Sequence, residues 1–199
     1  MRVLMNVCLR RMGLGCGVLL LVLLAVGCAL PGWPRSRGAD RTLLKPVEHV
    51  NLARYMGDWR VIANIPYFAE EGCVDSVESY ALRPDGRIDN VFTFRKGSFD
   101  APQKRVQALA WVHNTQTNAE WRVRFFGVVT EKYLVLDLDP DYRWTVVGHP
   151  SRKYGWIMAR EKTLPDEVYA GILKRLADQG YDPKRFVKVP QLPPAPSGR

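Results

Sequence analysis

The sequence predicts an all-β domain, built as an antiparallel sandwich or barrel, that is followed by one helix. Apolar and polar residues alternate with a period of two between Trp59 and Arg160, and turn-forming residues divide this stretch into about eight segments of similar length. After Arg160 the apolar residues recur at helical spacing instead. Strands therefore come first and the helix last.

The expected strands follow one another without intervening helices. The clearest turn is Pro84-Asp85-Gly86, which is a strong hairpin signal between the second and third strands. The expected strands cover residues 59–65, 74–83, 88–94, 106–112, 121–126, 132–138, 142–147 and 154–160.

One helix is expected after the last strand. Pro165 suits its first turn, and Asp166 and Glu167 complement the positive end of the helix dipole. Gly180 ends the helical pattern, and a short extended piece follows at 186–189. The apolar positions of the helix are Val168, Ile172, Leu173 and Leu176.

The first residues have the layout of a secretory signal, because Arg2, Arg10 and Arg11 precede a long uncharged apolar run. A membrane-spanning anchor is the alternative, but glycines and prolines shorten the apolar part of that run. The segment Leu-Ala-Val-Gly-Cys at 24–28 resembles the lipobox of bacterial lipoproteins. The resemblance implies cleavage before Cys28 and acylation of its thiol, and Ala29 favours the outer membrane, where the periplasmic face is expected.

These features predict the organisation of the whole chain. We expect a signal peptide at 1–27, a lipidated tether at 28–49, a folded domain at 50–190 and a Pro-rich flexible tail at 191–199. Cys73 would then be the last unmodified cysteine and could form no internal disulfide.

The formal charge of +9 invites a nucleic-acid partner until the charges are located. Residues 55–198 contain 20 basic and 18 acidic side chains, so most of the excess lies in the signal, tether and tail. No dense basic cluster occurs in the folded domain, and we therefore expect no nucleic-acid partner.

Three short motifs, in order along the chain, resemble those of the lipocalin family. The first is Gly-x-Trp at the first strand, the second keeps Asp-Tyr but has proline before it, and the third ends in arginine. The matching residues are Gly57 and Trp59, Asp141 and Tyr142, and Arg160. Residues 50–190 thus resemble a bacterial outer-membrane lipoprotein lipocalin, from the group similar to apolipoprotein D. The resemblance implies an eight-stranded antiparallel up-and-down barrel with the C-terminal α-helix packed outside.

The motif residues have a structural explanation as well. Gly57 permits a tight turn into the strand, and Trp59 can plug one end of the barrel. The guanidinium of Arg160 can stack on that indole. We expect these residues to close the base of the barrel and not to contact a ligand.

Strand alternation predicts which side chains point into the barrel when Trp59 and Arg160 are taken as inward. The expected lining is apolar and aromatic, which suits an acyl chain. It consists of Phe92, Phe94, Ala108, Ala110, Phe125, Leu134, Leu136, Trp156 and Met158. A single β-bulge would reverse this assignment locally, and the alternative is that these side chains fill the barrel.

The resemblance implies a protein that binds and stores or transports a fatty acid or lysophospholipid during maintenance of the cell envelope. No metal and no cofactor are expected, because no spacing of His, Cys and carboxylates resembles a metal site. No catalysis is expected either. The alternatives are an envelope interaction protein with a filled barrel, or a lipocalin-fold enzyme for which Glu78 or Tyr80 is the nearest titratable residue. The sequence leaves the oligomeric state open, a homodimer included.

Overall fold

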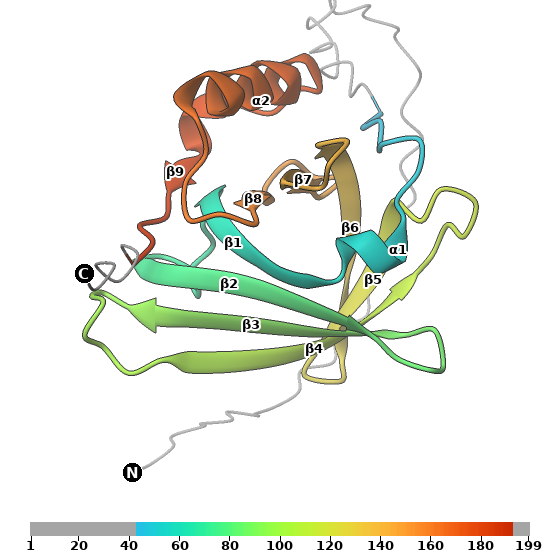
Figure 1. Ribbon diagram of the computed structural model, residues 1–199, viewed down its shortest axis with the longest axis horizontal. Helices are drawn as coiled ribbons and strands as arrows, with labels where there is room; N and C mark the ends of the chain where they lie inside the picture. Colours follow the sequence, from blue (N-terminus) through green and yellow to red (C-terminus); the bar gives the residue numbers. More distant parts are fainter. Residues whose placement is uncertain (1–42, 193–199) are drawn as a thin grey trace, which may run out of the picture. The chain divides into compact units, whose positions relative to one another are not determined.

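The computed structural model describes residues 43–192, which fold into one closed barrel with a helix on its outer side (Figure 1). The expected signal peptide, Cys28, the tether up to residue 42 and the tail from residue 193 lie outside the described residues. The sheet runs in the order β2-β3-β4-β5-β6-β7-β8-β1-β9, and β1 also pairs with β2. That last pairing closes the ring of β1 to β8.

All strand pairings are antiparallel, and each strand from β1 to β7 pairs with the next one in sequence, as in an up-and-down barrel. The strands are β1 (Gly57–Asn64), β2 (Cys73–Leu82), β3 (Ile88–Lys96), β4 (Lys104–Val112), β5 (Glu120–Phe125), β6 (Val129–Leu138), β7 (Trp144–Gly148), β8 (Gly155–Ala159) and β9 (Val187–Lys188). The helices are α1 (Leu52–Tyr55), α2 (Asp166–Asp178) and the 3₁₀ turn η1 (Pro183–Arg185). The predicted fold is confirmed, and α1 is an addition that the sequence pattern did not predict.

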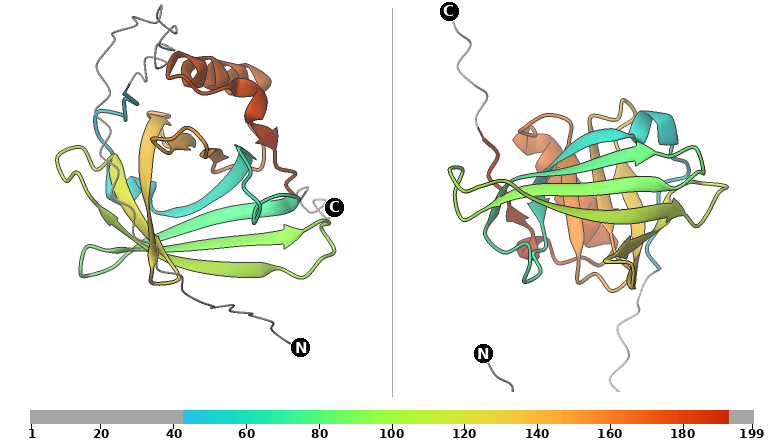
Figure 2. Two further views of the ribbon diagram at one scale, coloured as in Figure 1. Left: turned by 180° about the vertical axis from the view of Figure 1, so that it is seen from behind. Right: turned by 90° about the horizontal axis from the view of Figure 1, so that it is seen from below.

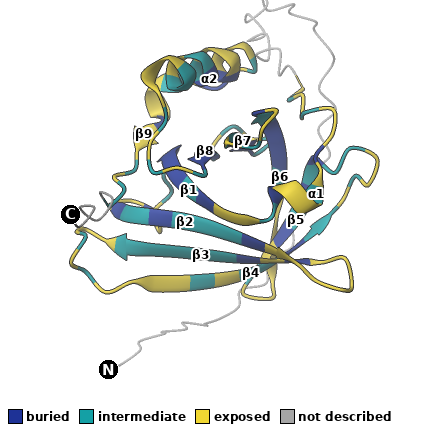
Figure 3. Ribbon diagram, in the orientation of Figure 1, coloured by how far each residue is buried: buried dark blue, intermediate teal, exposed yellow. Residues whose placement is uncertain are grey.

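The helix α2 lies along the outer side of the barrel, as both views in Figure 2 show. Its buried residues Ile172 and Leu176 belong to an apolar cluster with outward side chains of four strands. The strand members of this outer cluster are Ala63, Leu134, Leu136, Val146 and Ile157. Strands β7 and β8 are consequently buried on both faces, whereas β4 keeps one face in solvent (Figure 3).

The prediction that Leu134 and Leu136 line the barrel is wrong. Both side chains belong to the outer cluster under α2, and Tyr133 and Val135 point inward in their place. Strand β6 is apolar on both faces because the barrel interior covers one and the helix the other. A register shift between Val135 and Asp137 then changes the alternation again, as a bulge does.

Candidate functional site

The base of the barrel is closed by Trp59, which is fully buried and donates its indole N–H to the carbonyl of Tyr55 at 2.8 Å. The Arg160 guanidinium lies 3.7 Å from the centre of that indole ring. Gly57 adopts φ +92, and a Cβ there would lie 3.4 Å from the Arg160 guanidinium. The guanidinium also donates to the carbonyl oxygens of Asp58, Arg54 and Met56 at 2.8, 2.8 and 2.9 Å.

The second motif also belongs to this closed end. The hydroxyl of Tyr142 accepts the Asn51 N–H at 2.8 Å. Asp141, which the sequence motif singles out, is exposed, and the buried carboxylate of this turn is that of Asp139. Hydrogen bonds from Arg143 at 2.8 and 2.9 Å hold the pKa of Asp139 below its usual range.

An aromatic cluster that includes the Trp59 plug fills the lower half of the barrel. Its ring centres lie between 5.1 and 6.2 Å apart. The hydroxyls of Tyr80 and Tyr133 form a hydrogen bond of 2.7 Å at its upper surface. The cluster consists of Tyr55, Trp59, Tyr80, Trp121 and Tyr133. Of the residues expected to line a cavity, Ala110 and Met158 lie in this packed part, with at most 1% exposed surface.

The upper half of the barrel is lined by aromatic side chains that are only partly buried. Phe92, Ala108, Phe125 and Trp156 contact the inner core and keep exposed surface. The ring of Phe94 stacks on Phe92 with their centres 4.9 Å apart. Partly exposed inward side chains distinguish this half of the barrel, which is called the cup below, from the filled base.

Two carboxylic acids interrupt the apolar cup. Glu78 lies on β2, opposite Trp59 in the ladder, and accepts a hydrogen bond from the side-chain amide of Asn90. Burial, with a smaller contribution from the charge of Glu70, raises the pKa of Glu78 from 4.5 to about 8. Strand alternation predicted Glu78 as one of the titratable residues nearest to the barrel interior, and in the structure its side chain lies on the inner face of β2.

The second acid, Glu70, comes from the loop between β1 and β2. It accepts hydrogen bonds from the Asn64 amide and from the indole N–H of Trp156, the latter at 3.1 Å. Burial raises the pKa of Glu70 to about 7 although both hydrogen bonds act in the other direction. Sequence reasoning missed Glu70, because a loop residue has no periodic pattern that marks it as inward.

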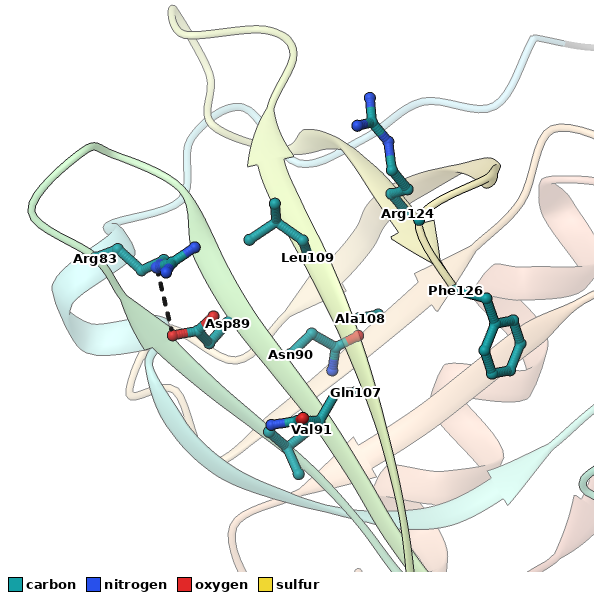
Figure 4. A pocket seen from close by; sticks show the side chains of 10 residues that line it. Arg83, Asp89, Asn90, Val91, Gln107, Ala108, Leu109, Arg124 and Phe126 are labelled. Atoms are coloured by element: carbon teal, nitrogen blue, oxygen red, sulfur yellow. Dashed lines mark ion pairs between the residues drawn. The ribbon is translucent and has the colours of Figure 1, made fainter.

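A separate depression of about 400 Å³ lies on the outer face of β3, β4 and β5 (Figure 4). The side chains of Asp89, Gln107 and Leu109 alternate with the inward Asn90 and Ala108 on the same strands. An ion pair of 3.6 Å joins Asp89 to Arg83 at its edge. The sheet therefore separates this depression from the cup.

Other kinds of site were also sought within residues 43–192. No group of three or more His, Cys, Asp and Glu side chains there is arranged to hold a metal ion. No helix in the same range is long and apolar enough to cross a membrane.

Comparison with known proteins gives consistent matches. Residues 50–191 match the family described as lipocalin-like domain. Outer membrane lipoprotein Blc of Escherichia coli K12 is 31% identical over 168 residues, which cover 84% of this chain and 90% of the relative. Temperature-induced lipocalin-1 of Arabidopsis thaliana is 31% identical over 164 residues, or 76% of this chain and 85% of the relative. Apolipoprotein D of Macaca fascicularis is 27% identical and covers 87% of this chain and 96% of its own length.

The fold has solved counterparts as well. Insecticyanin from the tobacco hornworm Manduca sexta superposes with a TM-score of 0.62 at 20% identity, covering 75% of this chain and 85% of that one. Apocrustacyanin C2 has a TM-score of 0.58 at 13% identity, covering 72% of this chain and 81% of that one. At these identities the likeness concerns the fold alone.

Proposed function

The chain belongs to the lipocalin family, and from that premise we propose that it binds a hydrophobic ligand in the upper half of its barrel. One observation carries the proposal: the inward aromatic side chains above the plug are only partly buried, although the same strands are tightly packed below. Exposed apolar surface inside a cup favours an apolar guest, because its burial gains about 25 cal/mol per Å².

The ligand proposed is a lipid with a single acyl chain, such as a fatty acid or a lysophospholipid. Phe92, Phe125 and Trp156 offer aromatic walls to the chain, and Ala108 leaves room between them. After the costs of association, burial of one long acyl chain supports an affinity on the order of micromolar. The function proposed is binding and transport of this lipid, without catalysis.

We further propose that the protein is held at the periplasmic face of the outer membrane through acyl chains on Cys28. The lipobox-like segment supports this, and so does the name of the relative from Escherichia coli, an outer membrane lipoprotein. Several acyl chains anchor a protein stably without a spanning helix. Cys28→Ser should move the protein from the membrane fraction to the soluble fraction, and retention of this variant in the membrane fraction would contradict lipid anchoring.

Ligand binding is testable with a chain that starts after Cys28, since every strand and helix described here lies within residues 43–192. A fluorescent acyl probe with an uncharged head group should bind this chain saturably. Ala108→Trp should weaken binding by about tenfold or more, because the indole fills the cup beside Asn90 and Phe125.

The matched control is Gln107→Trp, which places the same indole on the exposed outer face of β4. This variant should bind the probe like the unchanged chain. Equal affinity of both variants, or no saturable binding at micromolar probe, would contradict the cup as the ligand site. The second result would favour an envelope interaction protein with a filled barrel.

A further inference from the structure

The floor of the cup is acidic, which an apolar ligand alone does not explain. Glu78 lies directly above the aromatic cluster, and Glu70 lies higher on the wall beside Trp156. Each receives hydrogen bonds from neutral side chains only. Within residues 43–192 neither carboxylate forms an ion pair with a lysine or arginine. A buried carboxylate without a cation is costly, so a cation between these two acids would stabilise both.

A hydroxyl group without a partner lies in the same place. Ser76 is 2% exposed, and its Oγ has no hydrogen-bond partner among the described residues. Trp59 lies opposite Glu78 and Arg60 opposite Val77, so continuation of this register sets Ser76 opposite the inward Val61. The register shift of β2 between Val74 and Val77 contains Asp75, whose φ is +51, so the irregular residue precedes Ser76 and the alternation from Ser76 to Glu78 sets both on the inner side of β2.

The position of Ser76 relative to the two acids follows from the same ladder. Val61 lies on β1 between Trp59 and Asn64. Trp59 is opposite Glu78, and the side-chain amide of Asn64 donates a hydrogen bond to Glu70. Side chains two residues apart on a strand are about 6.6 Å apart, and an N–H···O hydrogen bond spans about 2.9 Å. Two such bonds span about 5.8 Å, and the flexible side chain of Glu78 can lean toward Ser76 by the remaining distance, so that one nitrogen reaches both oxygens.

We propose that Glu78, Ser76 and Glu70 form a subsite for the protonated amino group of an amphiphilic amine, whose apolar chain lies against the aromatic wall of the cup. An ammonium group has three N–H donors and no acceptor, and the subsite offers it three oxygen acceptors. The inference rests on the proposed function and narrows its ligand class. A lysophospholipid with an amino head group fits the subsite, whereas the carboxylate of a fatty acid would be repelled by ionised Glu78.

Within residues 43–192, Glu70 is the charged group that acts on Glu78. The phenols of Tyr55, Tyr67, Tyr80 and Tyr133 belong to the same electrostatic environment, and the Arg160 guanidinium acts there on Tyr55. Burial leaves both carboxyls partly protonated near pH 7, so an incoming ammonium must displace protons from them. Affinity for an amine should therefore rise with pH as long as the amine itself stays charged.

The experiment compares dodecylamine, dodecanol and laurate, which share one chain length, by calorimetric titration at pH 6 and pH 9. Dodecylamine should bind about tenfold more tightly than dodecanol at pH 9, and the ratio should shrink at pH 6. Laurate should be the weakest ligand at pH 9. Titration at pH 7 in buffers of different ionisation enthalpy should show proton release on binding of dodecylamine and none on binding of dodecanol.

Variants assign the effect to the subsite. Glu78→Gln and Glu70→Gln should each remove most of the preference for dodecylamine over dodecanol and reduce proton release, and a cooperative thermal unfolding transition shows that each variant is folded. Ser76→Ala should weaken amine binding a few-fold. Glu71→Gln removes an exposed charge from the same loop and should change nothing.

The outcomes separate this inference from the function on which it rests. If dodecanol and dodecylamine bind equally at pH 9, or if Glu78→Gln keeps the preference, the acidic subsite is refuted and the lipid-binding cup stands. If none of the three ligands binds, both the cup and the subsite are refuted.

Discussion

Arg160 joins the end of β8 to the segment 54–59 at the base of the barrel. Its guanidinium covers the Trp59 ring and donates to carbonyl oxygens on both sides of Gly57. Arg160→Ala should lower the free energy of unfolding by roughly 2–4 kcal/mol, because a stacking contact and several charge-assisted hydrogen bonds disappear together. Urea unfolding measures the loss.

The control for Arg160 is Arg87→Ala in the β2–β3 turn, where the exposed arginine pairs with Asp85. An exposed pair of this kind contributes about 0–1 kcal/mol. Similar losses for the two variants would contradict the role assigned to Arg160 at the closed end.

Glu78 should make stability depend on pH in a distinctive direction. Burial raises its pKa from 4.5 to about 8, so between these values the folded protein binds more protons than the unfolded chain. The free energy of unfolding should therefore fall as pH rises from about 4.5 to about 8, and Glu70 should add a similar fall that ends near pH 7. In Glu78→Gln the decline between pH 5 and pH 8.5 should be smaller by roughly 1–3 kcal/mol.

Denaturant unfolding at several pH values tests this expectation. Glu71→Gln is the matched control, because its carboxylate is exposed on the same loop as Glu70. Parallel pH profiles for the unchanged chain and Glu78→Gln would show that Glu78 is ionised in the folded protein without penalty.

Strands β6 and β5 each present an apolar side chain to a different side of the barrel wall. Leu136 packs against the outer cluster under α2, whereas Phe125 borders the cup. Leu136→Ala should cost about 2–5 kcal/mol of stability and leave ligand affinity unchanged, because its cavity opens under the helix. Phe125→Ala should weaken binding of the acyl probe with a smaller loss of stability, since its side chain is only partly buried. Thermal unfolding and probe titration on both variants provide the comparison, and a loss of affinity in Leu136→Ala would contradict the orientation of β6.

Strand alternation predicted faces well where one face is polar and poorly where both are apolar. Arg122 and Arg124 mark the outer face of β5, and the inward orientation of Phe125 followed correctly. On β6 no polar residue distinguishes the faces between Tyr133 and Leu136, so the prediction of Leu134 and Leu136 as inward had no physical basis in the pattern.

The parts of the site outside regular elements could not be read from the sequence. Glu70 reaches the cup through a loop, and Asp139 lies in the turn between β6 and β7, where it accepts hydrogen bonds from Arg143. Such positions depend on tertiary contacts, whereas the barrel itself follows from local alternation and turns. The prediction was therefore sound for the scaffold and incomplete for the polar groups within it.

For the molecule as a whole, the open end of the barrel differs from the closed end in its exposed apolar side chains. Phe68 is 85% exposed on the β1–β2 loop, and Phe126 and Val128 are 78% and 81% exposed on the β5–β6 loop. In an up-and-down barrel these loops lie at the same end, opposite the Trp59 plug. Exposed aromatic side chains around an opening suit contact with a lipid surface.

If the cup takes its ligand from a bilayer, the double variant Phe68→Ser, Phe126→Ser should load more slowly from vesicles. Transfer of the fluorescent acyl probe from phosphatidylcholine vesicles to the chain that starts after Cys28 should slow by about fivefold, because less apolar surface enters the interface. Affinity for the probe in solution should stay the same, since neither side chain belongs to the inner core. Leu82→Ser is the control, as Leu82 is exposed by 46% at the opposite end of β2. Equal slowing by Leu82→Ser would mean that exposed apolar residues in general, and not those at the rim of the cup, contact the bilayer. Unchanged transfer in the double variant would mean that the ligand enters from solution.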